Sequence, residues 1–194
     1  QAYVEFGQSP GSLTRQTATL ALRAGVPTEF ELTGLKPNAA CSYRLALQKS
    51  AGAPFTPQPE RRFHTARPRG SPFTFCIQGD SHPERPGRMY DPELYIRTLT
   101  NVASDAPDFY FTMGDDFSIE RLFEQNTLSQ PAVNAVYAHQ RGFLGLVGKA
   151  ASLMLVNGNH EQAARYLLDG TPNNVAVWAQ NARNAHYSQP APDL

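Results

Sequence analysis

Three short polar clusters in the sequence carry residue types that bind metal ions. They are Gly79-Asp-Ser-His82, Gly114-Asp-Asp116 and Asn157-Gly-Asn-His-Glu161. Each cluster directly follows an apolar run typical of a buried strand. In open α/β sheets, ligands bind beyond the carboxyl ends of the strands, so residues far apart in sequence meet there. The sequence therefore predicts that the three clusters converge on one site.

The residue types at this expected site suit metal chemistry. Asp80 and His82 are two positions apart, and on an extended backbone such residues point to the same side. A carboxylate together with an imidazole suits zinc, iron or manganese. Asp115 is a carboxylate that could bridge two ions, and Asn159 offers a neutral oxygen to the second ion. We therefore expect Asp80, His82, Asp115 and Asn159 to be the metal ligands.

The residues beside these ligands fit phosphoester hydrolysis. Two ions about 3.5–4 Å apart polarise a phosphoryl group and make hydroxide available at neutral pH. His160 follows a ligand and could donate a proton to the leaving oxygen, which makes it the expected catalytic residue. Glu161 could orient a ligand from behind, although a glutamate in the first turn of a helix is favourable in itself. Asp116 is interpreted as a solvated or ligand-orienting carboxylate.

A plainer interpretation competes at each cluster. Residues 79–82 could form a turn with polar caps, and Asn159 could cap a helix whose first turn holds His160. The glycine before each of Asp80, Asp115 and Asn159 permits close backbone approach at a tight turn. The occurrence of all three clusters in one chain favours the metal site over three unrelated turns.

The elements that must position these clusters begin at residue 73. Apolar runs at 73–77, 108–113 and 153–156 predict strands. Helices are predicted from Asp91, an N-cap followed by Pro92, and at 131–147, with two further helical pieces after about 161 that are interrupted at 170–172. This alternation predicts right-handed crossovers and a largely parallel sheet that is buried on both faces.

Residues 1–66 follow a different pattern. Short alternating runs at 3–6, 18–22, 28–32, 42–47 and 60–65 are separated by turn residues, which predicts a β-sandwich. Residues 67–72 have the proline, glycine and arginine content of a linker. The expected organisation is a β-sandwich at 1–66, a linker at 67–72 and an α/β domain at 73–194.

Composition narrows the class of partner. The chain has 194 residues, with 17 basic and 17 acidic side chains. This balance leaves no electrostatic footprint for nucleic acid or an anionic membrane, and the apolar runs are too short to cross a bilayer. We expect a small-molecule phosphoester substrate, no nucleic acid and no membrane partner; the oligomeric state is left open. Cys41 and Cys76 are expected to be buried free thiols rather than a disulfide.

In this order, the three polar clusters resemble the first three motifs of the calcineurin-like metallophosphoesterase superfamily. The segments 3–13, 32–38 and 63–65 resemble the fibronectin-III-like N-terminal domain of purple acid phosphatases. The resemblance covers nearly the whole chain. It implies hydrolysis of phosphomonoesters or phosphodiesters at a centre of two divalent or trivalent ions (iron, zinc or manganese), with metal-bound hydroxide as the nucleophile. It also implies a secreted or periplasmic protein.

The chain departs from this family at specific positions. Ser118 stands where the purple acid phosphatases have a tyrosine ligand of ferric iron, which favours a colourless metal pair. The family completes its ion sites with a further histidine and a Gly-His-x-His motif, whereas only His186 follows His160 here. His186 is interpreted as a surface or packing residue.

From these departures we expect a partial chain, with an N-terminally incomplete sandwich and the N-terminal half of the catalytic domain. Such a chain would be inactive by itself and would bind at most one ion tightly. The alternative hypothesis is a non-catalytic extracellular binding or adhesion module with a degenerate or incomplete metal site. A dinucleotide-binding domain is disfavoured, because no Gly-x-Gly-x-x-Gly turn follows any predicted strand.

Overall fold

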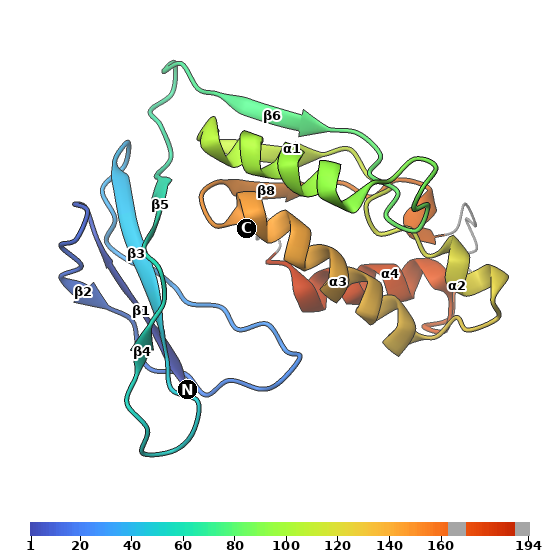
Figure 1. Ribbon diagram of the computed structural model, residues 1–194, viewed down its shortest axis with the longest axis horizontal. Helices are drawn as coiled ribbons and strands as arrows, with labels where there is room; N and C mark the ends of the chain where they lie inside the picture. Colours follow the sequence, from blue (N-terminus) through green and yellow to red (C-terminus); the bar gives the residue numbers. More distant parts are fainter. Residues whose placement is uncertain (163–169, 189–194) are drawn as a thin grey trace.

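Residues 1–66 contribute one antiparallel sheet. The computed structural model describes residues 1–162 and 170–188. The strands are β1 (Ala2–Gly7), β2 (Arg15–Gln16), β3 (Ala40–Leu47), β4 (Thr56–Pro57) and β5 (Arg61–His64). Their order is β2-β1-β3-β4, and β5 also pairs with β3 (Figure 1). The strands predicted at 3–6, 42–47 and 60–65 are thus confirmed as β1, β3 and β5.

The two strands predicted at 18–22 and 28–32 are wrong. In the structure this segment makes only an isolated bridge between Ala2 and Leu20. Its large apolar side chains stay in solvent, with Leu22 42% and Val26 57% exposed. Alternation produces a strand only where a partner edge and a buried face are available. Among the described residues the antiparallel strands form a single sheet, so the second sheet of a sandwich is not present there.

The second unit is built on a parallel sheet. Its strands are β6 (Phe75–Gln78), β7 (Phe109–Thr112) and β8 (Ser152–Leu155), in the order β6-β7-β8. Both pairings are parallel, with Phe75 opposite Phe109 and Phe109 opposite Ser152. The three predicted α/β strands and their parallel arrangement are therefore confirmed.

The helices follow the predicted alternation closely. They are α1 (Pro92–Ser104), α2 (Glu120–Glu124), α3 (Gln130–Gly148) and α4 (Val175–His186), with a single 3₁₀ turn η1 (His160–Gln162). The Asp91 side chain caps α1 by accepting the N–H groups of Glu93 at 2.9 Å and Leu94 at 3.0 Å. The helix predicted to begin near 161 falls largely on residues 163–169, which lie outside the described residues.

The parallel sheet is buried on one face only. The core consists mainly of residues from one sheet face and from the helices packed on it, including Leu99, Tyr110, Tyr137 and Leu144. On the opposite face Phe75 is 46%, Ile77 57% and Met154 45% exposed. The prediction of burial on both faces is therefore wrong for the described residues. The apolar composition of the strands is compatible with helices on both faces of the sheet. Among the described residues, however, no element covers the second face.

The two units touch through polar contacts. The Tyr43 hydroxyl donates to the carbonyl of Lys149 at 2.7 Å, just beyond the end of α3. Arg67, in the segment between the sheets, pairs with Asp108 at 2.7 Å. Cys41 and Cys76 are free thiols as predicted, but only Cys41 is buried, whereas Cys76 is half-buried. None of the described helices has the length and apolarity needed to cross a membrane.

Candidate metal centre

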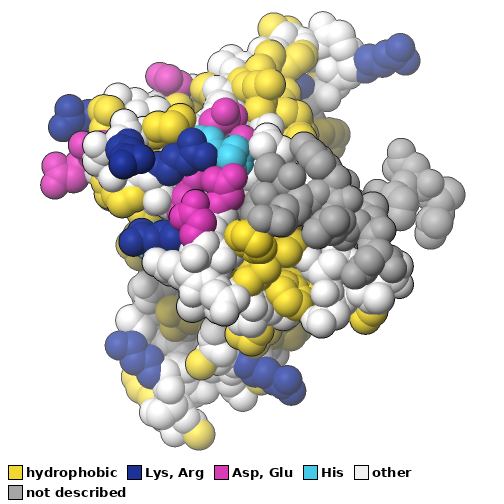
Figure 2. All heavy atoms as spheres, turned by 90° about the vertical axis from the view of Figure 1, so that its right-hand side faces the viewer, with side chains coloured by type: hydrophobic (Ala, Val, Ile, Leu, Met, Phe, Trp, Pro, Cys, Tyr) yellow, Lys and Arg dark blue, Asp and Glu magenta, His cyan; other side chains and the backbone are white. Residues whose placement is uncertain are grey.

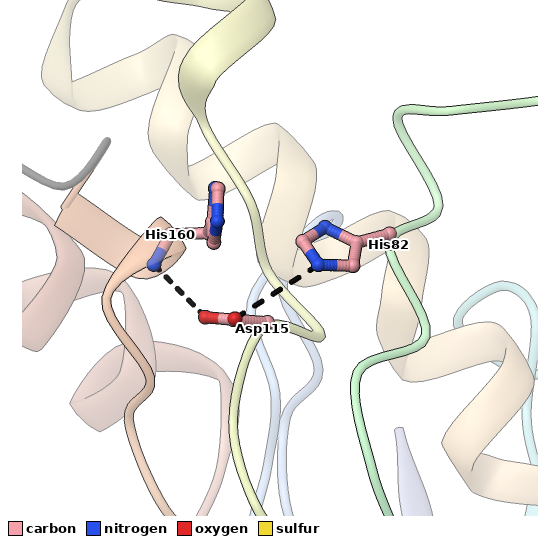
Figure 3. A group of neighbouring side chains, drawn as sticks. All are labelled: His82, Asp115 and His160. Carbon is pink, nitrogen blue, oxygen red and sulfur yellow. Dashed lines mark hydrogen bonds and ion pairs between the residues drawn. The ribbon is translucent and has the colours of Figure 1, made fainter. Parts of the chain in front are cut away.

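The loops that follow β6, β7 and β8 converge as predicted. One potential ligand atom each from His82, Asp115 and His160 lies within 4.8 Å of the other two. The three side chains face one another from three separate loops (Figure 3). His82 and Asp115 are buried and His160 is half-buried. The arrangement follows from the parallel topology, which delivers all three strand ends to one edge of the sheet.

The backbone at this edge is strained. His82 has a φ of 43° and Asp115 a φ of 60°, both in the left-handed region. A non-glycine residue there costs free energy and persists only where surrounding contacts hold it. The alternation predicted for Asp80 and His82 assumes an extended backbone, whereas His82 has a left-handed one. Asp80 is exposed and His82 is buried, and their joint binding of one ion stays a prediction.

Two glycines let the second and third loops touch. A Cβ added at Gly114 would lie 2.2 Å from the backbone nitrogen of Gly158. One added at Gly158 would lie 2.1 Å from Oδ1 of Asp115. Neither position can accept a side chain without displacing backbone or the Asp115 carboxylate. At Gly79 an added Cβ would meet nothing within 4 Å, so close approach explains two of the three glycines.

Glu161 holds the second and third loops together. Its carboxylate accepts four backbone N–H groups, from Asp115 (3.0 Å), Asp116 (2.9 Å), Phe117 (3.0 Å) and Gly158 (2.7 Å). The side chain is only 1% exposed. Hydrogen bonds from N–H groups to a buried charged acceptor are strong, and here they offset the cost of the left-handed turn at Asp115. The ligand-orienting role considered for Glu161 therefore matches its contacts.

His82 is held in one orientation by two acidic neighbours. Its Nδ1 lies 2.9 Å from Oε1 of Glu84, and its Nε2 lies 3.9 Å from Oδ2 of Asp115. An ionised carboxylate only accepts hydrogen bonds, so Nδ1 carries the proton in the neutral ring. This tautomer leaves the lone pair of Nε2 directed at the centre of the cluster, as a metal ligand requires.

His160 meets both other members of the cluster. Its backbone N–H donates to Oδ1 of Asp115 at 2.9 Å. Its ring lies edge-on to the ring of His82, with centroids 4.7 Å apart. Its Nδ1 lies 2.6 Å from Oε1 of Glu120 but out of line with the ring N–H, so this contact is an ion pair rather than a directed hydrogen bond.

Asp116 supports the first loop from behind. It is fully buried, and its Oδ1 accepts the hydroxyl of Ser81 at 2.7 Å and the amide of Gln78. Burial raises the pKa of Asp116 to about 7, although the hydrogen bonds from Ser81, Thr112 and Gln78 act in the opposite direction. Asp116 thus stabilises the loop that carries His82 and is not solvated.

Two predicted ligands, Asp80 and Asn159, have exposed side chains, and their roles as ligands stay predictions. Asp80 is not among the three residues whose potential ligand atoms converge. Ser118, three residues after Asp115, is buried. His186 is 7% exposed near the end of α4, which makes it a packing residue, and burial lowers its pKa.

Sequence reasoning missed Glu84 and Glu120, the two carboxylates beside the histidine rings. Glu84 lies two residues after His82, and Glu120 opens α2 five residues after Asp115. Ligating histidines are commonly held by a carboxylate, so the nearby acidic residues were the available signal. Figure 2 shows a histidine side chain at the surface among acidic side chains, with basic side chains beside it.

The comparisons with known proteins bear on the fold. No protein-family model matches the sequence, and no curated protein matches it. Among solved structures, the chain is similar to the purple acid phosphatase PPD1 from yellow lupin (Lupinus luteus) seeds, with a TM-score of 0.64 and 16% identity. The match covers 99% of this chain and 36% of the lupin chain. The chain shares its fold with part of a purple acid phosphatase.

This likeness spans both units of the chain. It places the antiparallel sheet and the parallel sheet with its helices in an arrangement also found in a metallophosphoesterase-type fold. At 16% identity it supports the fold, and the chemistry must be argued from the residues themselves.

Proposed function

We propose that this chain supplies part of the dinuclear metal centre of a phosphoester hydrolase. The observation that carries the proposal is the convergence of His82, Asp115 and His160 within 4.8 Å at the carboxyl ends of three parallel strands. The likeness of the fold to a purple acid phosphatase supports it independently. The proposal extends to residues 1–66 as an incomplete fibronectin-III-like domain, supported by the antiparallel pairing of β1, β3 and β5.

The residues present fit a metal ion. The imidazole of His82 and the carboxylate of Asp115 form a mixed nitrogen and oxygen donor set, which suits zinc, iron or manganese. The Nδ1–H tautomer of His82 leaves Nε2 available, and Asp115 is buried between the two rings. Asp80 and Asn159, on the flanking loops, are proposed to add further oxygen ligands. Bound ions would polarise the phosphoryl group and supply hydroxide at neutral pH.

The protein's own groups have separable tasks in this proposal. Asp115 is fixed by the backbone N–H of His160, which donates to Oδ1 and leaves Oδ2 facing His82. His160 is proposed to hold a proton for the leaving oxygen of the substrate. The carboxylate of Glu120 lies 2.6 Å from Nδ1 of this ring. The half-buried position of His160 lets its ring reach a substrate from solvent.

Hydrolysis of p-nitrophenyl phosphate and of its bis ester by the full-length protein, with added zinc, manganese or iron, tests this proposal. We expect metal-dependent turnover that falls by about 100-fold or more in Asp115→Asn and His160→Ala. His139→Ala is the matched control, because His139 is exposed on α3 and lies outside the cluster. Equal activity in Asp115→Asn and wild type would contradict the proposal. Tight metal binding with no turnover of either ester would favour a non-catalytic binding module.

A further inference from the structure

We propose that Arg85 is a positioning residue that aligns both histidines of the metal centre by holding the two glutamates beside them. This inference rests on the proposed function, because it assigns Arg85 a task at the same site. Arg85 touches neither histidine ring in any described contact. It acts through Glu84 and Glu120, which come from different loops.

Glu84 connects Arg85 to His82. Oε1 of Glu84 lies 2.9 Å from Nδ1 of His82 and 3.1 Å from Nε of Arg85. The Glu84 side chain is 10% exposed, so its charge is largely removed from water. One carboxylate oxygen therefore meets both the His82 ring and the Arg85 guanidinium, and the guanidinium fixes the position of that oxygen. Arg85 is the arginine that pairs with it.

Glu120 connects Arg85 to His160. Oε2 of Glu120 accepts a hydrogen bond from Nη2 of Arg85 at 3.2 Å. The other oxygen of the same carboxylate lies 2.6 Å from Nδ1 of His160. One guanidinium therefore connects the acidic partner of His82 with the acidic partner of His160. Only a planar fork with several N–H groups can hold two carboxylates in this way.

Each nitrogen of the guanidinium already has a partner within the protein. Nε pairs with Glu84, Nη2 with Glu120, and Nη1 donates to the sulfur of Met89 at 3.3 Å. The contacts therefore assign Arg85 to positioning rather than to substrate binding.

Arg88 provides a matched control. It lines the same cavity of about 500 Å³ as Arg85 and is exposed. Among the contacts of the described residues it forms no ion pair. Arg88→Gln therefore removes an equal charge from the same surface without touching either glutamate.

The direct readout is the tautomeric state of the two imidazole rings in the metal-free protein, measured by long-range proton–nitrogen NMR above the pH at which the rings are charged. We expect wild type to show the Nδ1–H form at His82. Arg85→Gln should convert His82 to a mixture of the two tautomers and shift the ring nitrogen signals of His160, and Arg88→Gln should leave both rings as in wild type. Zinc affinity should fall by about 10-fold in Arg85→Gln.

Further variants test the two glutamates one at a time and separate the charge of Arg85 from its shape. Glu84→Gln should alter the tautomer of His82 alone, and Glu120→Gln should shift the ring nitrogen signals of His160 alone. Arg85→Lys keeps the charge but offers one ammonium, which cannot reach both glutamates with the same geometry, so at least one ring should still change.

Unchanged ring tautomers in Arg85→Gln would overturn the proposal, as would an equal change in Arg88→Gln. Because the readout needs neither metal nor substrate, it separates the two proposals. A ring change without any phosphoesterase activity would support Arg85 as the positioning residue while contradicting the proposed function.

Discussion

The carboxylate of Glu161 accepts the backbone N–H of Asp115 at 3.0 Å, although the two residues lie 46 positions apart in sequence. This contact joins the loop after β7 to the loop after β8. It places the Asp115 side chain, whose Oδ1 in turn accepts the backbone N–H of His160 at 2.9 Å. Two carboxylates thus hold together the loops that carry the centre. Glu161 accepts the backbone N–H of Asp115, and Asp115 accepts the backbone N–H of His160.

Glu161→Gln should destabilise the protein and weaken metal binding together. Four N–H groups point at this carboxylate, and a glutamine would present a donor group to some of them. Leaving buried N–H groups unpaired predicts a loss of roughly 3 kcal/mol in the free energy of unfolding. Urea denaturation measures it. Glu93→Gln, on the exposed first turn of α1, should change the free energy of unfolding by less than about 1 kcal/mol. Similar values for the two variants would contradict the role of Glu161.

Gly158→Ala should disturb the centre through steric contact alone. The new Cβ would lie 2.1 Å from Oδ1 of Asp115, so the carboxylate or the loop must move. We expect a loss of about 2 kcal/mol in unfolding free energy and weaker zinc binding. Gly142→Ala is the control, since a Cβ there meets nothing within 4 Å. In the middle of α3 it should be neutral or stabilise by up to about 1 kcal/mol. Unchanged unfolding free energy and zinc binding in Gly158→Ala would contradict this close approach of Gly158 to Asp115.

The ion pair of Asp108 predicts a defined pH dependence of stability. The backbone N–H of Thr74 and the Arg67 guanidinium lower the pKa of Asp108 below the ordinary range of an aspartate. A lowered pKa means that the folded state favours the charged carboxylate. The contribution is therefore present above a pH of about 4 and is lost as the pH falls through the folded-state pKa.

Asp108→Asn should accordingly cost about 1 kcal/mol of unfolding free energy at neutral pH, a value reduced by solvent around the pair. Below the folded-state pKa, where the Asp108 carboxyl is uncharged, the variant and wild type should converge. Chemical denaturation across this range measures the difference. Asp105→Asn, at the exposed end of α1, should leave the curve unchanged. A constant difference between wild type and Asp108→Asn at every pH would contradict the ionic origin.

Tyr43→Phe should loosen the contact between the two units. The lost hydrogen bond to the carbonyl of Lys149 is half-buried, and its removal predicts a loss of about 1 kcal/mol. Hydrogen exchange at the end of α3 should accelerate, since that carbonyl follows the last turn. Tyr3→Phe is the control, because the Tyr3 ring packs on Phe55 and no described residue accepts its hydroxyl proton. Equal exchange in both variants would show that the hydroxyl of Tyr43 does not couple the units.

The sequence was informative where a local pattern has one structural outcome. Asp91 before Pro92 predicted the start of α1, and three apolar runs predicted β6, β7 and β8. The positions of His82, Asp115 and His160 at the strand ends then followed from the parallel topology. The pattern at 18–32 failed because alternation alone does not supply a partner strand, and Leu22 and Val26 remain in solvent.

The finer geometry of the site could not be read from the sequence. His82 has a left-handed backbone, whereas the spacing of two residues from Asp80 was interpreted on an extended chain. The contacts of Glu84, Arg85 and Glu120 depend on how two loops are placed side by side. Burial of the sheet on one face depends on which elements cover it, a tertiary property that strand composition does not encode.

Titration of the protein with zinc by calorimetry, beside Asp115→Asn and His82→Ala, tests the central claim most directly. We predict that one ion binds tightly to wild type and that the affinity falls by at least about 100-fold in each variant. Loss of a metal ligand lowers the affinity more than loss of a residue that only hydrogen-bonds to a ligand. His139→Ala should bind like wild type. Unchanged zinc affinity in both Asp115→Asn and His82→Ala would contradict the assignment of this cluster as a metal centre.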